Sequence, residues 1–123
     1  MAVFTTIVLL IVIASLSSMA KAADALPMLN AQRAYFRLPP LQFDPVLYAA
    51  AERDCQARAA SGRGGHLRSG ARPGRAEGVG HRSGSDPLGK RFYTCYQSTR
   101  KYTRAGAAVV VGNGRTFYQL KLR

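Results

Sequence analysis

A glycine- and arginine-rich stretch from Ser61 to Asp86 divides this chain of 123 residues and constrains its fold more than any other feature. Local propensity favours neither helix nor strand there, because glycine destabilises both and the charged residues are poor strand formers. The residues before it predict two helices, and those after it predict a helix and a β-hairpin. A loop this long inside a small domain is usually either functional or disordered. The function therefore depends on whether the Ser61–Asp86 stretch is ordered.

The N-terminal 20 residues contain no charged side chain, and Ile7–Ala14 is a compact apolar run. Such a run, followed by the small residues of Ala20-Lys21-Ala22, is typical of a signal peptide cleaved after Ala22. Cleavage after Ala25 is a second candidate. An uncleaved membrane anchor is the alternative, although spanning a bilayer takes about 20 apolar residues. We predict a signal peptide over residues 1–22, one domain over residues 23–123, and a secreted, periplasmic or extracellular location.

Two helices are predicted before the Ser61–Asp86 stretch. Apolar spacing from Pro27 to Arg37 fits one helical face, and the prolines that follow end that helix. Asp44-Pro45 predicts the start of a second helix that runs to about Ser61 and stops at Gly62. Its buried stripe is predicted to be Leu47, Ala51, Cys55 and Ala59, with Glu52, Arg53, Gln56 and Arg58 mostly outside it.

A third helix and a hairpin are predicted after the stretch. The helix begins at Asp86-Pro87 and ends near Ser98, with Leu88, Phe92, Cys95 and Tyr96 as its apolar face. Ala107–Val111 reads as a strand buried on both faces, and Asn113-Gly114 is the preferred pair for a type I′ turn. In the last strand, Thr116, Tyr118, Leu120 and Leu122 share one face, and Phe117, Gln119, Lys121 and Arg123 share the other. These elements predict an α+β fold with a small antiparallel sheet.

The charge of the chain points to acidic partners. Lysine and arginine number 18 against 6 aspartate and glutamate residues, a formal net charge of +12. Such a field attracts acidic polymers and membrane surfaces, in a salt-dependent way. The stretch lacks aromatic rings for stacking, and export argues against intracellular nucleic acid. The candidate polyanion-binding residues are Arg63, Arg68, Arg72, Arg75 and Arg82.

The two cysteines, Cys55 and Cys95, each fall on the apolar face of a predicted helix. In an oxidising compartment they can form a disulfide. Two buried thiols that never meet are the alternative, and the sequence leaves both open.

Both histidines and one carboxylate lie in the stretch. His66 and His81 flank Glu77, a combination that can ligate zinc with an open fourth position or act as a proton-transfer pair. A histidine held by an ordinary structural hydrogen bond is the alternative. Short zinc-binding spacings such as HExxH are absent, as are the GxSxG and GxGxxG motifs.

The order of several short motifs matches a known family. The N-terminal part contributes Leu29-Asn30, Arg33, Leu38-Pro39-Pro40-Leu41, Asp44, Leu47 and Ala50; His66 and Glu77 follow, and Gly106–Val109, Asn113-Gly114 and Tyr118 complete the pattern. From Met28 to Arg123 the chain resembles the CAP superfamily, or SCP-like domains, and most closely its short bacterial members. The resemblance implies a three-layer α-β-α sandwich, secretion and a cavity of two histidines and two acidic residues that binds zinc in some members. It also implies binding of lipid, sterol or protein without a general enzymatic activity.

The chain departs from this family pattern at the second cavity histidine. The nearest match is Gly89-Lys90-Arg91, where lysine opposes a cation, and His81 is a spatial substitute. We therefore predict a non-enzymatic binding domain without a cofactor, whose cavity residues are His66, Glu77, His81 and Lys90. Zinc held by His66 and Glu77 is an alternative. The expected ligand is a protein, lipid or polysaccharide. The alternative function is binding of anionic surfaces, namely polysaccharide, acidic lipid or extracellular nucleic acid, through the arginines.

Overall fold

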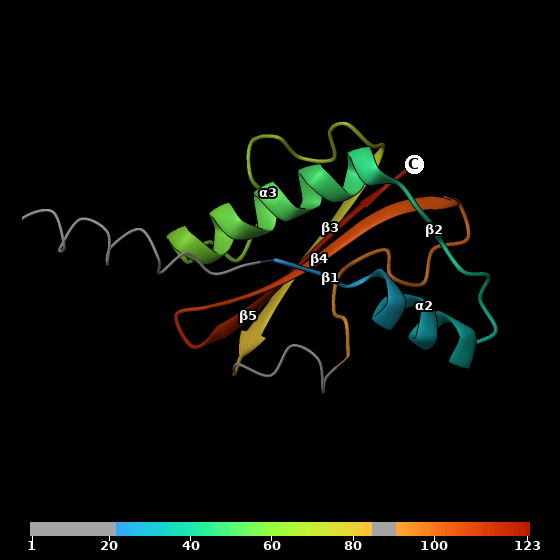
Figure 1. Ribbon diagram of the computed structural model, residues 1–123, viewed down its shortest axis with the longest axis horizontal. Helices are drawn as coiled ribbons and strands as arrows, with labels where there is room; N and C mark the ends of the chain where they lie inside the picture. Colours follow the sequence, from blue (N-terminus) through green and yellow to red (C-terminus); the bar gives the residue numbers. More distant parts are fainter. Residues whose placement is uncertain (1–21, 85–90) are drawn as a thin grey trace, which may run out of the picture.

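The computed structural model describes residues 22–84 and 91–123 (Figure 1). Its helices are α2 (Leu26–Tyr35) and α3 (Pro45–Ser61), and its strands are β1 (Ala23–Asp24), β2 (Gln42–Phe43), β3 (Ala76–Ser83), β4 (Arg104–Gly112) and β5 (Arg115–Leu122). The predicted signal peptide up to residue 21 and the first part of the predicted third helix lie outside the described residues. No helix within the described ranges has the length and hydrophobicity needed to cross a bilayer.

The five strands form one sheet in the order β1-β4-β5-β3, and β2 pairs with the start of β4. The β4–β5 and β3–β5 pairs are antiparallel, as is β1–β4, whereas β2 runs parallel to β4. Asn113 and Gly114 have φ angles of 55° and 69°, as the predicted type I′ turn of the β4–β5 hairpin requires. The predicted α+β class and C-terminal hairpin are confirmed.

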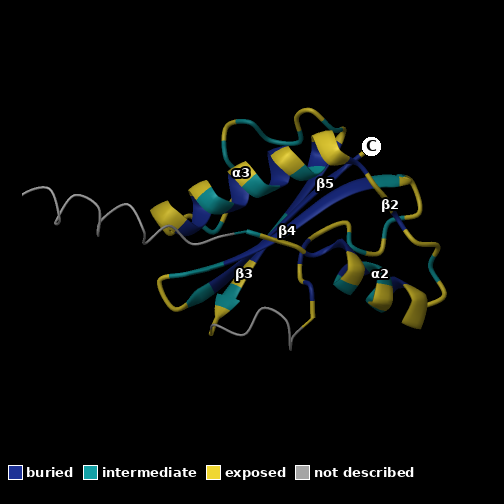
Figure 2. Cartoon of the chain, in the orientation of Figure 1, coloured by how far each residue is buried: buried dark blue, intermediate teal, exposed yellow. Residues whose placement is uncertain are grey.

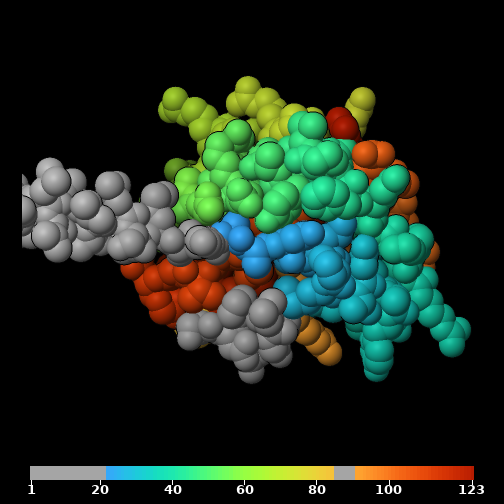
Figure 3. Space-filling model, viewed as in Figure 1, coloured from blue at the N-terminus to red at the C-terminus, as the bar shows by residue number. Residues whose placement is uncertain are grey.

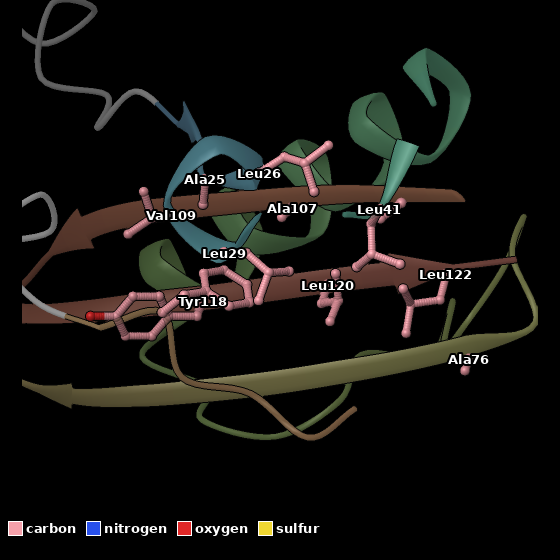
Figure 4. Close-up of a cluster of buried hydrophobic side chains, with 12 residues drawn as sticks. Ala25, Leu26, Leu29, Leu41, Ala76, Ala107, Val109, Tyr118, Leu120 and Leu122 are labelled. Carbon is pink, nitrogen blue, oxygen red and sulfur yellow. The ribbon is translucent and has the colours of Figure 1, made fainter. Parts of the chain in front are cut away.

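Both faces of the β4–β5 hairpin are buried, because successive side chains point to opposite sides of a strand (Figure 2). One hydrophobic cluster contains Leu26 and Leu29 of α2 with Val109, Tyr118, Leu120 and Leu122 (Figure 4). The other contains Ala51, Cys55 and Ala59 of α3 with Ala108, Val110 and Phe117. The predicted buried stripe of α3 is therefore correct.

The ends of α3 follow directly from local sequence. The Asp44 side chain accepts hydrogen bonds from the backbone N–H groups of Val46 and Leu47 at 3.0 and 3.2 Å, and Gly62 ends the helix with a φ of 70°. Arg104 and Arg123 also bind the Asp44 carboxylate, at 3.0 and 2.5 Å. Desolvation raises the pKa of Asp44, but these hydrogen bonds outweigh it and lower the pKa to about 2.

The prediction that the whole Ser61–Asp86 stretch lacks regular structure is wrong for Ala76–Ser83. These residues pair with β5 along their full length, since the edge of β5 that does not face β4 supplies hydrogen-bond partners that local propensity does not reveal. Side chains at Gly78 and Gly80 would overlap the carbonyl groups of Cys95 and Tyr93. The two glycines therefore let the chain around residues 93–95 pass directly over β3.

The predicted third helix is also wrong over its described part, residues 91–98. Phe92 is fully buried, and its backbone N–H and C=O both bond to the side-chain amide of Gln32. Arg33 binds the carbonyl oxygen of Gln97, and Tyr96 has a φ of 64°, which interrupts a right-handed helix. Contacts with α2 therefore hold this segment in an irregular conformation.

Candidate functional site

A buried polar cluster lies on the α3 side of the sheet, beneath the loop of residues 62–75. Its members are Asp54 and Arg58 of α3, Ser69 of the loop, Glu77 of β3, and Gln119 and Lys121 of β5. These side chains come from four separate parts of the chain, so the cluster exists only in the folded protein.

Lys121 is the centre of the polar cluster and has no exposed surface. Its Nζ lies 2.7 Å from Asp54 Oδ2 and 3.1 Å from Glu77 Oε1. The same ammonium group donates to the backbone oxygens of Gly70 and Arg72 at 2.6 and 2.9 Å. One cation therefore neutralises two carboxylates and fastens the loop to the sheet.

Ser69 fixes the loop at a second point, because its hydroxyl donates to Asp54 Oδ2 at 2.6 Å. Desolvation raises the pKa of Asp54, but the hydrogen bonds from Lys121 and Ser69 have the larger combined effect and lower that pKa. The Asp54 carboxylate is consequently held in its charged form beneath the loop.

The prediction that Arg58 lies outside the buried stripe of α3 is wrong, because its side chain is fully buried. Its guanidinium group donates to five acceptors between 2.6 and 3.2 Å away: the oxygens of Arg63, Gly64, Gly80 and Tyr118, and Gln119 Oε1. Burial lowers the pKa of Arg58, whereas the negative charge of Glu77 raises it. Arg58 thereby joins β3 and β5 to the start of the loop.

His66 and Glu77 form the predicted pair. His66 Nδ1 lies 2.7 Å from Glu77 Oε2, while Glu77 Oε1 contacts Gln119 and Lys121. The His66 side chain is 55% exposed and that of Glu77 only 3%. The pair therefore presents an oriented imidazole to solvent above a fixed, buried carboxylate, an arrangement that can accept a hydrogen bond or exchange a proton.

Of the other two predicted cavity residues, His81 does not join this pair. His81 is exposed, with Nδ1 2.5 Å from Arg115 Nη2, and its ring packs beside Gly64. Lys90 lies outside the described residues. Among residues 22–84 and 91–123, no three His, Cys, Asp or Glu side chains lie close enough together to hold a metal ion.

Four of the five predicted polyanion-binding arginines, namely Arg63, Arg68, Arg72 and Arg75, are exposed. Arg82 is half-buried, with its guanidinium carbon 5.7 Å from the centre of the Tyr118 ring. An open groove of about 690 Å³ lies between the first turns of α3 and the turn at residues 69–73, and its lining includes Arg53 and Arg72. The arginines of the loop are thus available to an acidic partner.

The two cysteines are free thiols, so the disulfide alternative is not formed. Cys55 is buried against the sheet, with its sulfur 3.3 Å from the Phe117 oxygen, whereas Cys95 is exposed. Burial raises the pKa of Cys55 to about 12, which keeps it protonated and unreactive.

We expect iodoacetamide to modify Cys95 alone in the native protein and both cysteines after denaturation. Mass spectrometry of tryptic peptides distinguishes the two sites. Failure of both thiols to react in denaturant without reductant, with a mass lower by two hydrogens, would contradict the free-thiol state.

Most of the polar cluster was not identified from the sequence. Gln119 and Lys121 alternate with apolar residues along the last strand. The neighbouring strand, Ala107–Val111, is predicted to be buried on both faces, which indicates that the face carrying Gln119 and Lys121 is covered as well. Asp54 and Arg58 are four residues apart beside the buried stripe of α3. These two spacings are the sequence signals that could have located the polar cluster, and no such signal marks Ser69.

No protein-family model matches the chain, and no curated protein sequence matches it. Function is therefore inferred from the site and from the order of the motifs.

Proposed function

We propose that the chain is an exported, non-enzymatic binding domain of the CAP type. The observation that carries this proposal is the His66–Glu77 pair, which the motif order predicts and which lies at the solvent edge of the polar cluster. In this reading the exposed imidazole contacts the ligand, and Glu77 orients it.

The contacts of the N-terminal motif support the CAP-type assignment. Asn30 and Leu41 exchange two hydrogen bonds, at 2.8 and 3.0 Å, and Arg33 Nε donates to the Pro39 oxygen at 2.9 Å. The motif residues therefore fix the path from α2 to α3. We further propose a three-layer α-β-α arrangement with α2 and α3 as the outer layers, which the division of the core into two clusters supports.

Two features favour binding over catalysis. Lys121 places a positive charge 3.1 Å from Glu77 Oε1, where it opposes a second cation such as zinc. Ser69 carries the hydroxyl nearest to His66 along the chain. That hydroxyl donates its hydrogen bond to Asp54 and not to the imidazole. An activated nucleophile would need the histidine as its base.

Equilibrium dialysis against Zn²⁺ tests this reading of the site. We expect equal and negligible zinc uptake by the wild-type protein and the His66→Ala variant. Stoichiometric uptake that is lost in His66→Ala would instead assign a metal site to this pair.

Export is part of the proposal, and β1 favours one cleavage position. Cleavage after Ala22 leaves β1 intact, whereas cleavage after Ala25 removes its pairing with β4 and the buried Ala25. We expect the mature protein to begin at Ala23. N-terminal sequencing of protein recovered outside the cytoplasm tests this, and a full-length chain retained in the membrane would favour the anchor.

Binding of acidic polymers or membranes through the loop is the second candidate function. The exposure of four loop arginines and the arginine-lined groove favour it. A variant with glutamine at positions 63, 68, 72 and 75 should elute from immobilised heparin at clearly lower salt than the wild type. Retention of both proteins to the same salt concentration would count against this function.

A further inference from the structure

We propose that the surface formed by the end of α2 and residues 91–100 binds single-stranded nucleic acid, with aromatic rings stacking on bases and arginines pairing with phosphates. The exposed rings and arginines of these two segments, here called the aromatic–arginine surface, are Tyr35, Phe36, Arg91, Tyr93, Tyr96 and Arg100. Tyr35, Phe36 and Arg91 line one hollow, and Tyr93 lies beside Gly80 of β3. The aromatic–arginine surface shares no residue with the His66–Glu77 pair or the loop arginines, so it does not depend on either proposed function.

The exposed rings are the first observation. Tyr35, Phe36, Tyr93 and Tyr96 are 81%, 59%, 61% and 53% exposed, and they are four of the six large apolar side chains exposed in the described residues. The rings of Tyr35 and Phe36 meet edge to face with centres 5.1 Å apart. Rings this exposed contribute little to the core and are available for contact with a ligand.

The two segments that carry these rings are fastened together. Gln32 Nε2 donates to the Phe92 oxygen at 3.1 Å, and Arg33 Nη1 donates to the oxygens of Gln97 and Thr99 at 3.0 and 2.9 Å. A hollow of about 310 Å³ remains between them, lined by Tyr35, Phe36, Arg91 and Gln97 among others. In the space-filling view, side chains in the teal colours of the end of α2 project into solvent (Figure 3). The surface is therefore a fixed platform with a recess.

The charge of this surface has one sign. Arg91 lines the hollow, and Arg37 is exposed just after α2. Arg100 is an exposed cation, and its charge acts on Arg33, whose pKa is lowered first by burial and then by this neighbour. The sequence contains no aspartate or glutamate in residues 25–43 or 87–123. A polyanion is thus the complementary partner.

The combination of rings and arginines selects among polyanions. Unpaired bases offer flat faces to aromatic side chains, and the phosphates between them pair with arginine. Duplex DNA keeps its bases stacked inside the helix, and a sulfated polysaccharide has charge but no aromatic bases. The surface therefore fits a single strand better than either.

Fluorescence anisotropy with a short labelled oligothymidylate tests the proposal. We expect an unlabelled oligothymidylate to compete at least about tenfold better than an abasic strand of equal length and charge. The Tyr35→Ala/Tyr93→Ala variant should lose this advantage, whereas Tyr35→Phe/Tyr93→Phe should keep it. Arg91→Gln should weaken binding and reduce the salt dependence by about one phosphate contact.

The loop variant with glutamine at positions 63, 68, 72 and 75 separates this site from the loop function. We expect it to retain the preference for bases over the abasic strand. Equal competition by the abasic strand or heparin, or unchanged binding by Tyr35→Ala/Tyr93→Ala, would overturn the proposal. Loss of all binding in the loop variant would also overturn it and assign the polyanion site to the loop.

Discussion

Replacing Lys121 with methionine is expected to lower the free energy of unfolding by about 3–5 kcal/mol, the usual cost of removing one partner of a buried ion pair. The substitution leaves the carboxylates of Asp54 and Glu77 buried without their cation. It also removes the donor to the Gly70 and Arg72 oxygens, so the loop loses its central attachment. Urea unfolding followed by circular dichroism measures the change.

Lys101→Met is the matched control, because Lys101 is exposed and the substitution is chemically identical. We expect its free energy of unfolding to change by no more than about 0.5 kcal/mol beyond the small loss of its contact with Tyr102. Adding Asp54→Asn and Glu77→Gln to Lys121→Met should recover part of the loss, since neither position then holds a buried carboxylate without its cation. Equal stability of Lys121→Met and Lys101→Met would contradict the role of the ammonium group.

Gly106→Ala is expected to be the second severe substitution, with a loss of about 3 kcal/mol or more from overpacking. A methyl group at this position of β4 would overlap the backbone of Leu47 and Tyr48 in the first turns of α3. The helix cannot retreat freely, because Asp44 at its start is bound by arginines of the sheet. Thermal unfolding measures the loss as a lower Tm.

Gly65→Ala is the control for the Gly106→Ala substitution. An added methyl group there meets nothing within 4 Å, and Gly65 has no positive φ. Its stability should be unchanged or slightly higher, because alanine restricts the unfolded chain. A similar Tm for the Gly65 and Gly106 variants would show that α3 does not rest directly on β4.

The parts of the fold that the sequence predicted are those with local signals. Asp44-Pro45 and Gly62 mark the ends of α3, and Asn113-Gly114 marks the hairpin turn. The start of β3 has no such signal, because its stability comes from pairing with β5. The Asp86-Pro87 signal failed over residues 91–98, where Gln32 and Arg33 of α2 bind the backbone that a helix would have used.

The candidate site was predicted only at its rim. The pairing of His66 with Glu77 followed from the order of the motifs. That order indicates which residues come together but not which contacts hold them in place. Lys121 and Arg58 were missed because charged residues are expected at the surface, and their burial depends on partners from α3, the loop and β5. Such partners are far apart in the sequence and adjacent only after folding.

Limited trypsin digestion under native conditions tests most directly whether the loop of residues 62–75 is an ordered cover. Arg63 and Arg68 are exposed sites within it, and cutting requires the loop to open locally. We predict that the wild-type protein resists cleavage after these arginines, while Lys121→Met is cut there rapidly. Rapid cleavage of the wild-type loop at the same rate as in Lys121→Met, with the rest of the domain intact, would contradict an ordered cover and leave the His66–Glu77 pair without support.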